Sequence, residues 1–261
     1  MLADYHVHSA HSDDSQAPME DMIRQALALG LDEICFTEHV DYGVDTVTNC
    51  DYAAYFAELD AMRRQYGDRI AVLGGIEFGI QTGTVERYQA EFDRWPFDFV
   101  ILSCHQVDNL EFWRNDYQQG KTQDQYQAAY YREILEVCRR YKNYSVLGHL
   151  DVIKRYDRAR PYPDEKILPL AEQILRQTIA DGRGIEVNTS SFRYGLEDLT
   201  PSRRLLELYR DLGGEILTFG SDAHAPSALG DHIPQVKAEL KAMGFRSFCT
   251  FRRMRPVYHE L

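Results

Sequence analysis

The chain has 261 residues, of which 44% are hydrophobic, and a formal net charge of −12 at pH 7. This length and apolar content predict one large α/β domain over residues 1–261 rather than a disordered chain. The acidic balance argues against a nucleic-acid partner, because proteins that follow a phosphate backbone carry clustered Lys and Arg. No signal peptide or apolar run of transmembrane length is visible, and the five cysteines are widely spaced without a C-x-x-C pair. We therefore expect a cytoplasmic protein with reduced thiols and no membrane partner.

Apolar runs of strand length alternate with stretches of helical period along the chain. The expected order is strand 2–5, helix 18–29, strand 33–37, helix 52–66, strand 70–78, helix 84–93, strand 97–103, helix 121–141, strand 145–150, helix 167–180, strand 184–187, helix 202–212, strand 216–220, helix 233–243 and a closing strand 247–251. Seven or eight successive βα units without a linker predict a parallel sheet covered by helices. Their number favours a closed or nearly closed TIM-like barrel over an open sheet.

Polar side chains follow each of the first seven strands, where a (β/α) barrel carries its functional groups. They are His6 and His8, Glu38 and His39, Glu77, His105, His149 and Asp151, Glu186 and Asn188 with Ser190 and Arg193, and Asp222 with His224. Taken singly, each histidine is more often a structural residue than a ligand. Together, imidazoles and carboxylates beyond the same ends of so many strands predict a polynuclear site for Zn²⁺, Mn²⁺ or Fe²⁺.

The same residues resemble a known family. H-V-H at 6–8, E-H at 38–39, the single Glu77, His105 and His149, and D-A-H at 222–224 resemble the PHP (polymerase and histidinol phosphatase) superfamily in motif order over essentially the whole chain. G-H-L-D-V-I-K-R-Y at 148–156, E-V-N-T-S at 186–190 and S-D-A-H-x-P at 221–226 are similar to its histidinol-phosphate phosphatase branch. The resemblance implies a distorted (β/α)7 barrel with two or three divalent ions. It also implies hydrolysis of L-histidinol phosphate to L-histidinol and phosphate, a step of histidine biosynthesis.

The resemblance further implies a ligand set. One ion would be held by His6, His8, Glu77 and Asp222, and a second by Glu77, His105 and His149, with Glu77 bridging. A third would take His39, His224 and a group from the first loop, for which His11 is the first choice and Asp14 the substitute. The loop reads H-S-D-D at 11–14, where the family pattern has Ser-Asp-Gly, so the third ion is the one that the match leaves open.

The chemistry expected of such a site is in-line attack on phosphorus by a hydroxide that two ions share. Glu77, Asp222 and His224 are the candidate catalytic groups: Asp222 would orient the hydroxide, and His224 would give a proton to the departing alcohol. For substrate binding, Lys154, Arg155, Arg158 and Arg193 are candidates for the phosphate, with Arg155 and Arg193 preferred. Glu186, Asn188 and Asp151 suit an ammonium or imidazole group.

Other functions remain open at this point. A PHP phosphoesterase acting on another small phosphorylated metabolite or nucleotide, a PHP nuclease and a non-catalytic metal-binding regulatory module would share part of the pattern. A binuclear amidohydrolase also begins with H-x-H on a barrel strand, but a bridging lysine is expected after strand four, where His105 stands. The sequence leaves the oligomeric state undetermined.

Overall fold

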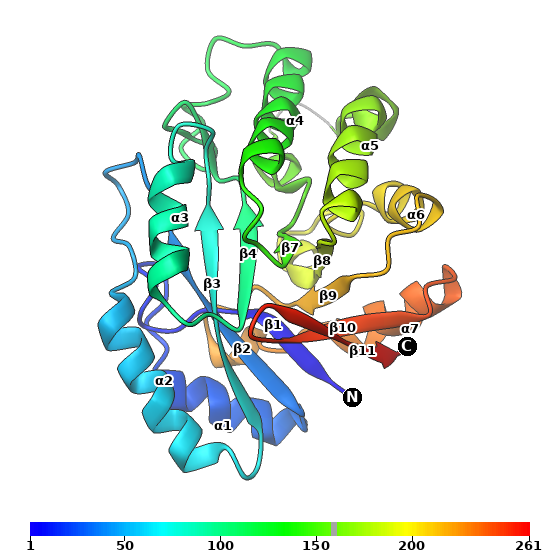
Figure 1. The fold of residues 1–261 in the computed structure, drawn as a ribbon. Coiled ribbons are helices and arrows are strands. Elements are labelled where there is room, and N and C mark those ends of the chain that lie inside the picture. The colour runs from blue at the N-terminus through cyan, green and yellow to red at the C-terminus, as the bar shows by residue number, and fades with distance from the viewer. Residues whose placement is uncertain (158–160) are drawn as a thin grey trace.

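The structure, a computed structural model, describes residues 1–157 and 161–261. Its centre is a sheet of seven parallel strands, in the order β1-β2-β3-β4-β7-β8-β9. The strands are β1 (Ala3–Val7), β2 (Glu33–Val40), β3 (Ala71–Gly79), β4 (Phe99–Ser103), β7 (Val146–Leu147), β8 (Gly184–Asn188) and β9 (Leu217–Gly220). The two edge strands meet where the His8 N–H donates to the Ala223 carbonyl at 2.9 Å. The expected, nearly closed barrel is confirmed (Figure 1).

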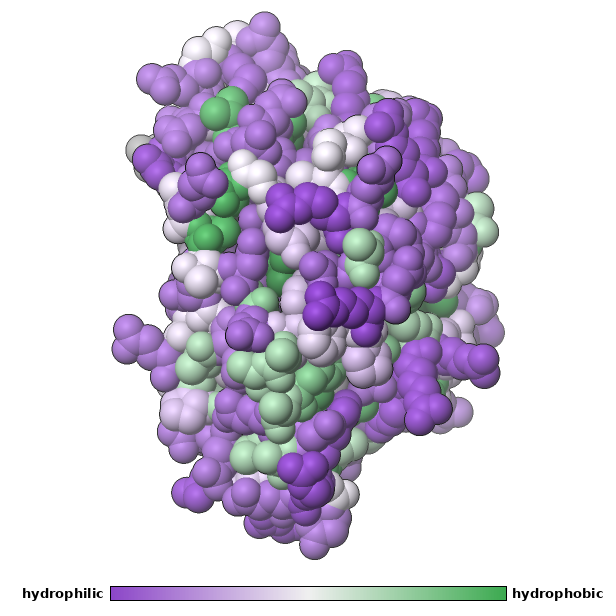
Figure 2. Space-filling model, turned by 60° about the vertical axis from the view of Figure 1, so that its left-hand side comes forward, coloured by the Kyte–Doolittle hydropathy of each residue, from purple (hydrophilic) through white to green (hydrophobic). Residues whose placement is uncertain are grey.

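Helices surround this barrel and follow most of its strands (Figure 1). They are α1 (Met19–Leu29), α2 (Tyr52–Tyr66), α3 (Val85–Arg94), α4 (Gln123–Arg140), α5 (Asp164–Ala180), α6 (Arg203–Asp211) and α7 (Ile233–Ala242). Their ends follow local capping chemistry: Thr122 and Gln125 form a capping box at the start of α4, and Gly30 ends α1 in the left-handed conformation. The side of the molecule drawn in Figure 2 is mostly hydrophilic, with a group of apolar side chains in its lower half.

Short elements lie on the loops beyond the carboxyl ends of the strands. They are the hairpin β5 (Gln106–Val107) and β6 (Leu110–Glu111) and the 3₁₀ helices η1 (Val152–Tyr156), η2 (Thr189–Ser191) and η3 (Pro226–Ala228). Among the described residues, no helix combines the length and the apolar character that a membrane crossing requires.

The expected closing strand does not join the barrel. Instead, β10 (Ser247–Arg252) pairs antiparallel with β11 (Arg255–Glu260), a strand that the sequence pattern did not indicate. Cys249 and Phe251 of this hairpin pack with Tyr5 and Phe99 inside the barrel, at the amino-terminal ends of β1 and β4. The Phe251 N–H donates to the Tyr5 hydroxyl at 2.9 Å. Because β1 already pairs with the chain after β9, the barrel offers no free edge to a further strand. The hairpin instead packs against the bottom of the barrel and closes it.

The fifth strand of the barrel is shorter than the expected span 145–150. β7 ends at Leu147, and the chain leaves the sheet at His149, whose φ is 20°. This turn directs the loop that follows toward the carboxyl end of the barrel, where η1 begins.

Candidate metal centre

The Glu77 carboxylate lies at the centre of the carboxyl-terminal end of the barrel and is fully buried. Imidazole nitrogens approach it from four directions: His6 Nε2 at 3.1 Å, His39 Nδ1 at 3.0 Å, His105 Nε2 at 3.2 Å and His149 Nε2 at 2.9 Å. Burial raises the pKa of Glu77, but the neighbouring imidazoles outweigh it and hold that pKa well below its usual value. Glu77 is therefore a carboxylate at neutral pH.

A bulge in β1 aims His6 at this carboxylate. Asp4 pairs with Ile34 and Val7 with Phe36, so one extra residue stands on β1 between these pairs. Tyr5 consequently points into the apolar bottom of the barrel while His6 points into its polar top, although neighbours on a regular strand face opposite sides.

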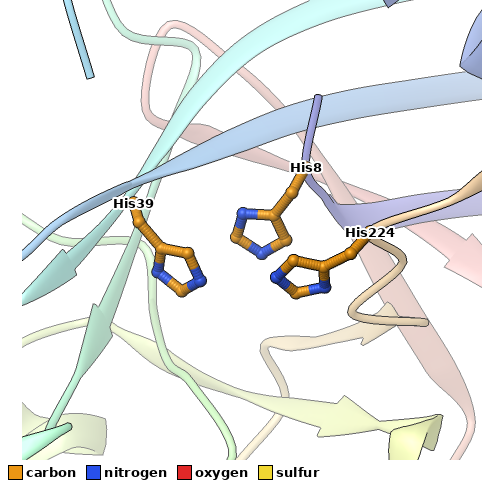
Figure 3. A group of neighbouring side chains, drawn as sticks. All are labelled: His8, His39 and His224. Carbon is orange, nitrogen blue, oxygen red and sulfur yellow. The ribbon is translucent and has the colours of Figure 1, made fainter. Parts of the chain in front are cut away.

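His8 stands between His39 and His224 (Figure 3). The three rings are stacked, with centroids 4.2 Å apart for His8 and His39 and 4.1 Å for His8 and His224. Burial, together with the neighbouring His224 and His39, lowers the pKa of His8 well below its usual value, so its ring is neutral. Its buried Nε2 has no hydrogen-bond partner among the described residues and lies 3.7 Å from Asp222 Oδ1.

The second nitrogen of four of these rings is held by an outer partner. The pairs are His6 Nδ1 with Glu186 (2.6 Å), His8 Nδ1 with Ser12 (3.1 Å), His105 Nδ1 with Asp41 (2.8 Å) and His224 Nδ1 with the Asp222 carbonyl (3.0 Å). Such partners fix ring orientation and tautomer and leave Nε2 to the interior, as they do in metal sites.

Donor atoms close enough to share one ion form four overlapping groups. The groups are His6, His8 and Asp222; His6, Glu77 and His149; His39, Glu77 and His105; and His8, His39 and His224. We call these eight residues the histidine–carboxylate cluster. Their imidazole and carboxylate donors, with an unpaired buried nitrogen on His8, fit Zn²⁺, Mn²⁺ or Fe²⁺. The carboxylates that raise the pKa of His6 against the effect of burial would equally attract a divalent cation.

The first-loop group that lies beside the cluster is Asp14. Its Oδ2 lies 3.0 Å from His224 Nε2 and 3.6 Å from His39 Nε2. Burial raises the pKa of Asp14, but its hydrogen bonds with these two rings hold it below the usual value. His11, the first choice from sequence, instead places Nε2 2.8 Å from Glu58 Oε2 on α2.

The conformation of the first loop explains why His11 lies beside Glu58 and not beside the cluster. Buried Glu38 accepts hydrogen bonds from the Ser9 N–H at 3.0 Å and from the hydroxyls of Ser9 and Ser12 at 2.6 Å. These bonds hold the start of the loop against β2, where the His11 ring contacts Glu58 of α2, and further along the loop Asp14 lies beside His224 and His39.

A cavity of about 360 Å³ opens above the cluster. It is lined by Asp13, Asp14, His39, Asp41, Thr46, Val47, His105, Phe112, Trp113, His149, Val152, Arg155, Tyr156, Tyr194, Asp222 and His224. Its wall is thus partly aromatic, carries several carboxylates and includes the guanidinium group of Arg155, which suits a small ligand with aromatic, cationic and anionic parts.

Comparison with known proteins identifies the family. A model of the PHP domain matches residues 4–190. The chain belongs to the PHP family. A histidinol-phosphatase of Lactococcus lactis subsp. lactis is 32% identical over 97% of this chain and 95% of the relative. A probable histidinol-phosphatase of Thermotoga maritima is 28% identical over 94% of this chain and 93% of the relative.

A solved structure of a PHP relative has the same fold. The crystal structure of histidinol phosphate phosphatase from Lactococcus lactis, in complex with zinc, L-histidinol and phosphate, superposes with a TM-score of 0.91. It is 29% identical to this chain, and the match covers 98% of each chain.

Of the substrate-binding residues expected from the PHP resemblance, Arg155 lines the cavity. Its guanidinium donates to Ser190 Oγ at 2.6 Å, lies 3.4 Å from Asp222 Oδ2 and stacks on Tyr194 at 3.9 Å from the ring centroid. Arg155 Nε is buried without a hydrogen-bond partner in the part of the chain that the structure describes.

The structure places the other expected substrate residues elsewhere in the PHP barrel. Arg193 donates to the Ser221 and Asp222 carbonyls at 2.6 and 2.8 Å, and Lys154 contacts Asp151 and the Leu199 carbonyl. Their charged groups are therefore used within the protein. Glu186 and Asn188 lie behind His6 and Asp222 rather than at the cavity wall. Arg158 lies outside the described residues.

Sequence reasoning missed several residues of this site. Asp41 holds His105 and follows His39 by two positions, so the alternation of β2 could have indicated it. Phe112 and Trp113 come from the turn after β6, and Tyr194 from the segment after η2, where no regular pattern marks a residue as facing the cavity.

Proposed function

We propose that this PHP chain hydrolyses a small phosphomonoester, L-histidinol phosphate, to L-histidinol and phosphate with two or three divalent metal ions as cofactors. The observation that carries the proposal is the buried Glu77 carboxylate, which four imidazoles contact, three of them from residues that also line a cavity with the Arg155 guanidinium. Relatives that match nearly the whole chain bear the name histidinol-phosphatase, which supports the same reaction and its place in histidine biosynthesis.

The histidine–carboxylate cluster would hold the ions. His6, His8 and Asp222 offer one set of donors, and Glu77 with His149 or His105 offers the next. His39, His224 and Asp14 would complete a third. Bound Zn²⁺, Mn²⁺ or Fe²⁺ would supply Lewis-acid charge to the phosphoryl oxygens and make water a nucleophile at neutral pH.

Arg155 would bind the phosphate group. Its guanidinium is fixed by Ser190 and Asp222 on one side and by the Tyr194 ring on its face, and Arg155 lines the cavity. A guanidinium held in this way is preorganised, so little side-chain entropy is lost when phosphate oxygens accept its hydrogen bonds.

Asp222 and His224 would handle the water and the leaving group. The Asp222 carboxylate lies 3.7 Å from His6 Nε2 and from His8 Nε2, where it can orient the attacking water. His224, 27% exposed and paired with Asp14, stands at the cavity wall, and in the form with two ions bound its Nε2 can carry the proton that passes to the departing alcohol oxygen.

The rest of the wall would recognise the histidinol part. Asp13 and Asp41 are carboxylates that suit an ammonium or an imidazolium, and Trp113 and Tyr156 offer faces for a flat ring. We also propose the cytoplasm as the compartment, because all five cysteines are unpaired and buried.

A phosphate-release assay tests the function. Purified protein, analysed for metal content, would be given L-histidinol phosphate, simple phosphomonoesters without an amine, a nucleoside monophosphate and an oligonucleotide. We expect the highest kcat/KM for L-histidinol phosphate, loss of turnover after chelation and recovery with Zn²⁺ or Mn²⁺. Equal turnover of all monoesters would remove the substrate assignment. Turnover unaffected by complete chelation would remove the metal-dependent mechanism.

A further inference from the structure

Glu186 is a buried carboxylate that links two strands of the barrel without lining the cavity. Its Oε1 lies 2.6 Å from His6 Nδ1, and its Oε2 accepts the backbone N–H of His149 at 2.8 Å. It is 1% exposed, and the cavity-lining residues in the described part of the chain do not include it. Sequence reasoning placed it with the substrate, but its oxygens are directed at two members of the cluster.

The hydrogen-bond inventory of this carboxylate constrains His6. An ionised carboxylate only accepts hydrogen bonds, so the ring must donate from Nδ1. The lone pair of a neutral His6 ring is then on Nε2, which lies 3.1 Å from Glu77 Oε2 and 3.7 Å from Asp222 Oδ1. Glu186 thus selects the tautomer that can bind an ion inside the cluster.

The neighbouring backbone leaves room for this contact. A Cβ on Gly220 would stand 2.1 Å from Glu186 Oε1 and 2.4 Å from His6 Cβ, which no side chain could tolerate without displacing both. Only glycine at the end of β9 allows Glu186 and His6 to approach this closely.

The same short segment also holds Asp222. Two residues after Glu186, the Asn188 amide lies 3.4 Å from Asp222 Oδ2, and the Ser190 hydroxyl donates to that oxygen at 3.2 Å. Asp222 has a φ of 55°, a conformation that a non-glycine residue adopts only when surrounding contacts hold it. The E-V-N-T-S segment therefore contacts cluster members from three other strand ends.

We propose that Glu186 is a positioning residue that fixes His6 and His149 for metal binding, and that it does not bind substrate. This inference rests on the proposed metal sites and gives the E-V-N-T-S segment a role apart from the histidinol group.

The decisive variant is Glu186→Gln, which keeps the size of the side chain. A glutamine has one acceptor oxygen, and its NH₂ group can only donate, whereas the three groups that contact Glu186, on His6, His149 and Asn188, are N–H groups. If the glutamine oxygen stays on the His149 N–H, the NH₂ group faces His6 Nδ1 and selects the other ring tautomer. If the oxygen turns to His6, the His149 contact is lost. We expect the dissociation constant of Zn²⁺, measured by chelator competition without substrate, to rise about 10- to 100-fold, with an unchanged KM at saturating metal.

A matched control is Glu33→Gln. Glu33 is also buried in the barrel, but it contacts Tyr5 and Arg252 at the amino-terminal end. This control should lower stability and leave Zn²⁺ affinity unchanged. If Glu186→Gln leaves Zn²⁺ affinity at the wild-type value, or raises KM alone, the positioning role is refuted. Because affinity is measured without turnover, a failure of the phosphatase proposal would be seen separately, in the wild-type assay.

A measurement on the wild-type protein covers the case in which Glu186→Gln does not fold. Two-bond ¹H–¹⁵N correlation spectra of the ¹⁵N-histidine-labelled zinc protein report which ring nitrogen carries the proton. The His6 signals, assigned by their loss in His6→Gln, should show the proton on Nδ1. A proton on Nε2, with Nδ1 bound to the metal, would contradict the proposal.

Discussion

Replacing Glu77 by glutamine tests the centre of the proposed site. The substitution keeps the volume and one oxygen, and it removes a buried negative charge that four imidazoles contact within 3.2 Å. Glu77 belongs to two of the four groups of donors that could hold an ion. We therefore expect the variant to lose metal affinity at more than one position and to lose turnover with it.

The expected magnitude follows from the charge. Two unit charges about 4 Å apart interact by about 4 kcal/mol at an effective dielectric constant of about 20. Because about 1.4 kcal/mol corresponds to a factor of ten, one such interaction is worth about 10³-fold in affinity. Glu77 would contact divalent ions, so we expect kcat/KM and metal affinity to fall by at least about 10³-fold.

The assay measures phosphate release and metal content on the same preparation, with Glu33→Gln as the control for loss of a buried carboxylate away from the cluster. Circular dichroism should show that both variants are folded. A Glu77→Gln protein that keeps its full complement of metal and wild-type turnover would refute the central position assigned to this residue.

Three further predictions concern the groups around Glu77. Asp14→Asn should lower kcat/KM and the bound metal-to-protein ratio, whereas His11→Gln should leave both at the wild-type value; the reverse result in elemental analysis and kinetics would restore His11 as the ligand. Arg155→Met should lower kcat/KM about 10- to 150-fold with full metal content, because hydrogen bonds to charged groups are worth about 1.5–3 kcal/mol; unchanged steady-state kinetics would exclude it from the phosphate site. Burial lowers the pKa of His105, but the charge of Asp41 and its neighbours raises it to about 9. A pKa raised in the folded state stabilises the protein fully below about pH 6.5, and this stabilisation is lost as the pH rises through about 9. Urea unfolding of the chelated protein should therefore show a free energy of unfolding that falls over this range. In Asp41→Asn the free energy of unfolding should depend less on pH over the same range.

The barrel could be predicted because its signal is local. Each strand is an apolar run, each helix has an apolar stripe such as Met19, Met22, Ile23 and Ala26 on α1, and parallel strands need crossovers of that kind. The last segment shows the limit of this signal. Residues 247–251 have a strand pattern, but whether they enter the sheet depends on the pairing of β1 with Ala223, which no local pattern contains.

The gathering of candidate ligands could be predicted because topology places the ends of all parallel strands at one rim. The same rule cannot separate a metal ligand from the residue that holds it. Glu77 and Glu186 both stand near the end of a barrel strand, yet Glu77 faces four rings, whereas Glu186 accepts hydrogen bonds from His6 and from the backbone of His149. The choice between His11 and Asp14 depends on the folded first loop, which buried Glu38 determines from another strand.

The position of the site along the barrel axis is the level at which the side chains inside the barrel change from apolar to polar. On β3, the interior residue changes from Leu73 to Glu77, and on β4 from Ile101 to Ser103, whose hydroxyl donates to Glu77 at 2.6 Å. On β1 the change occurs between adjacent residues, and the bulge makes this possible. The apolar layer below keeps water from the lower side of the cluster, so charges there interact in a medium of lower effective dielectric constant. The bulge in β1 therefore determines two things together: the direction of the His6 side chain, and the level along the barrel axis at which apolar side chains such as Tyr5 give way to polar ones. A change that removed the bulge would alter both.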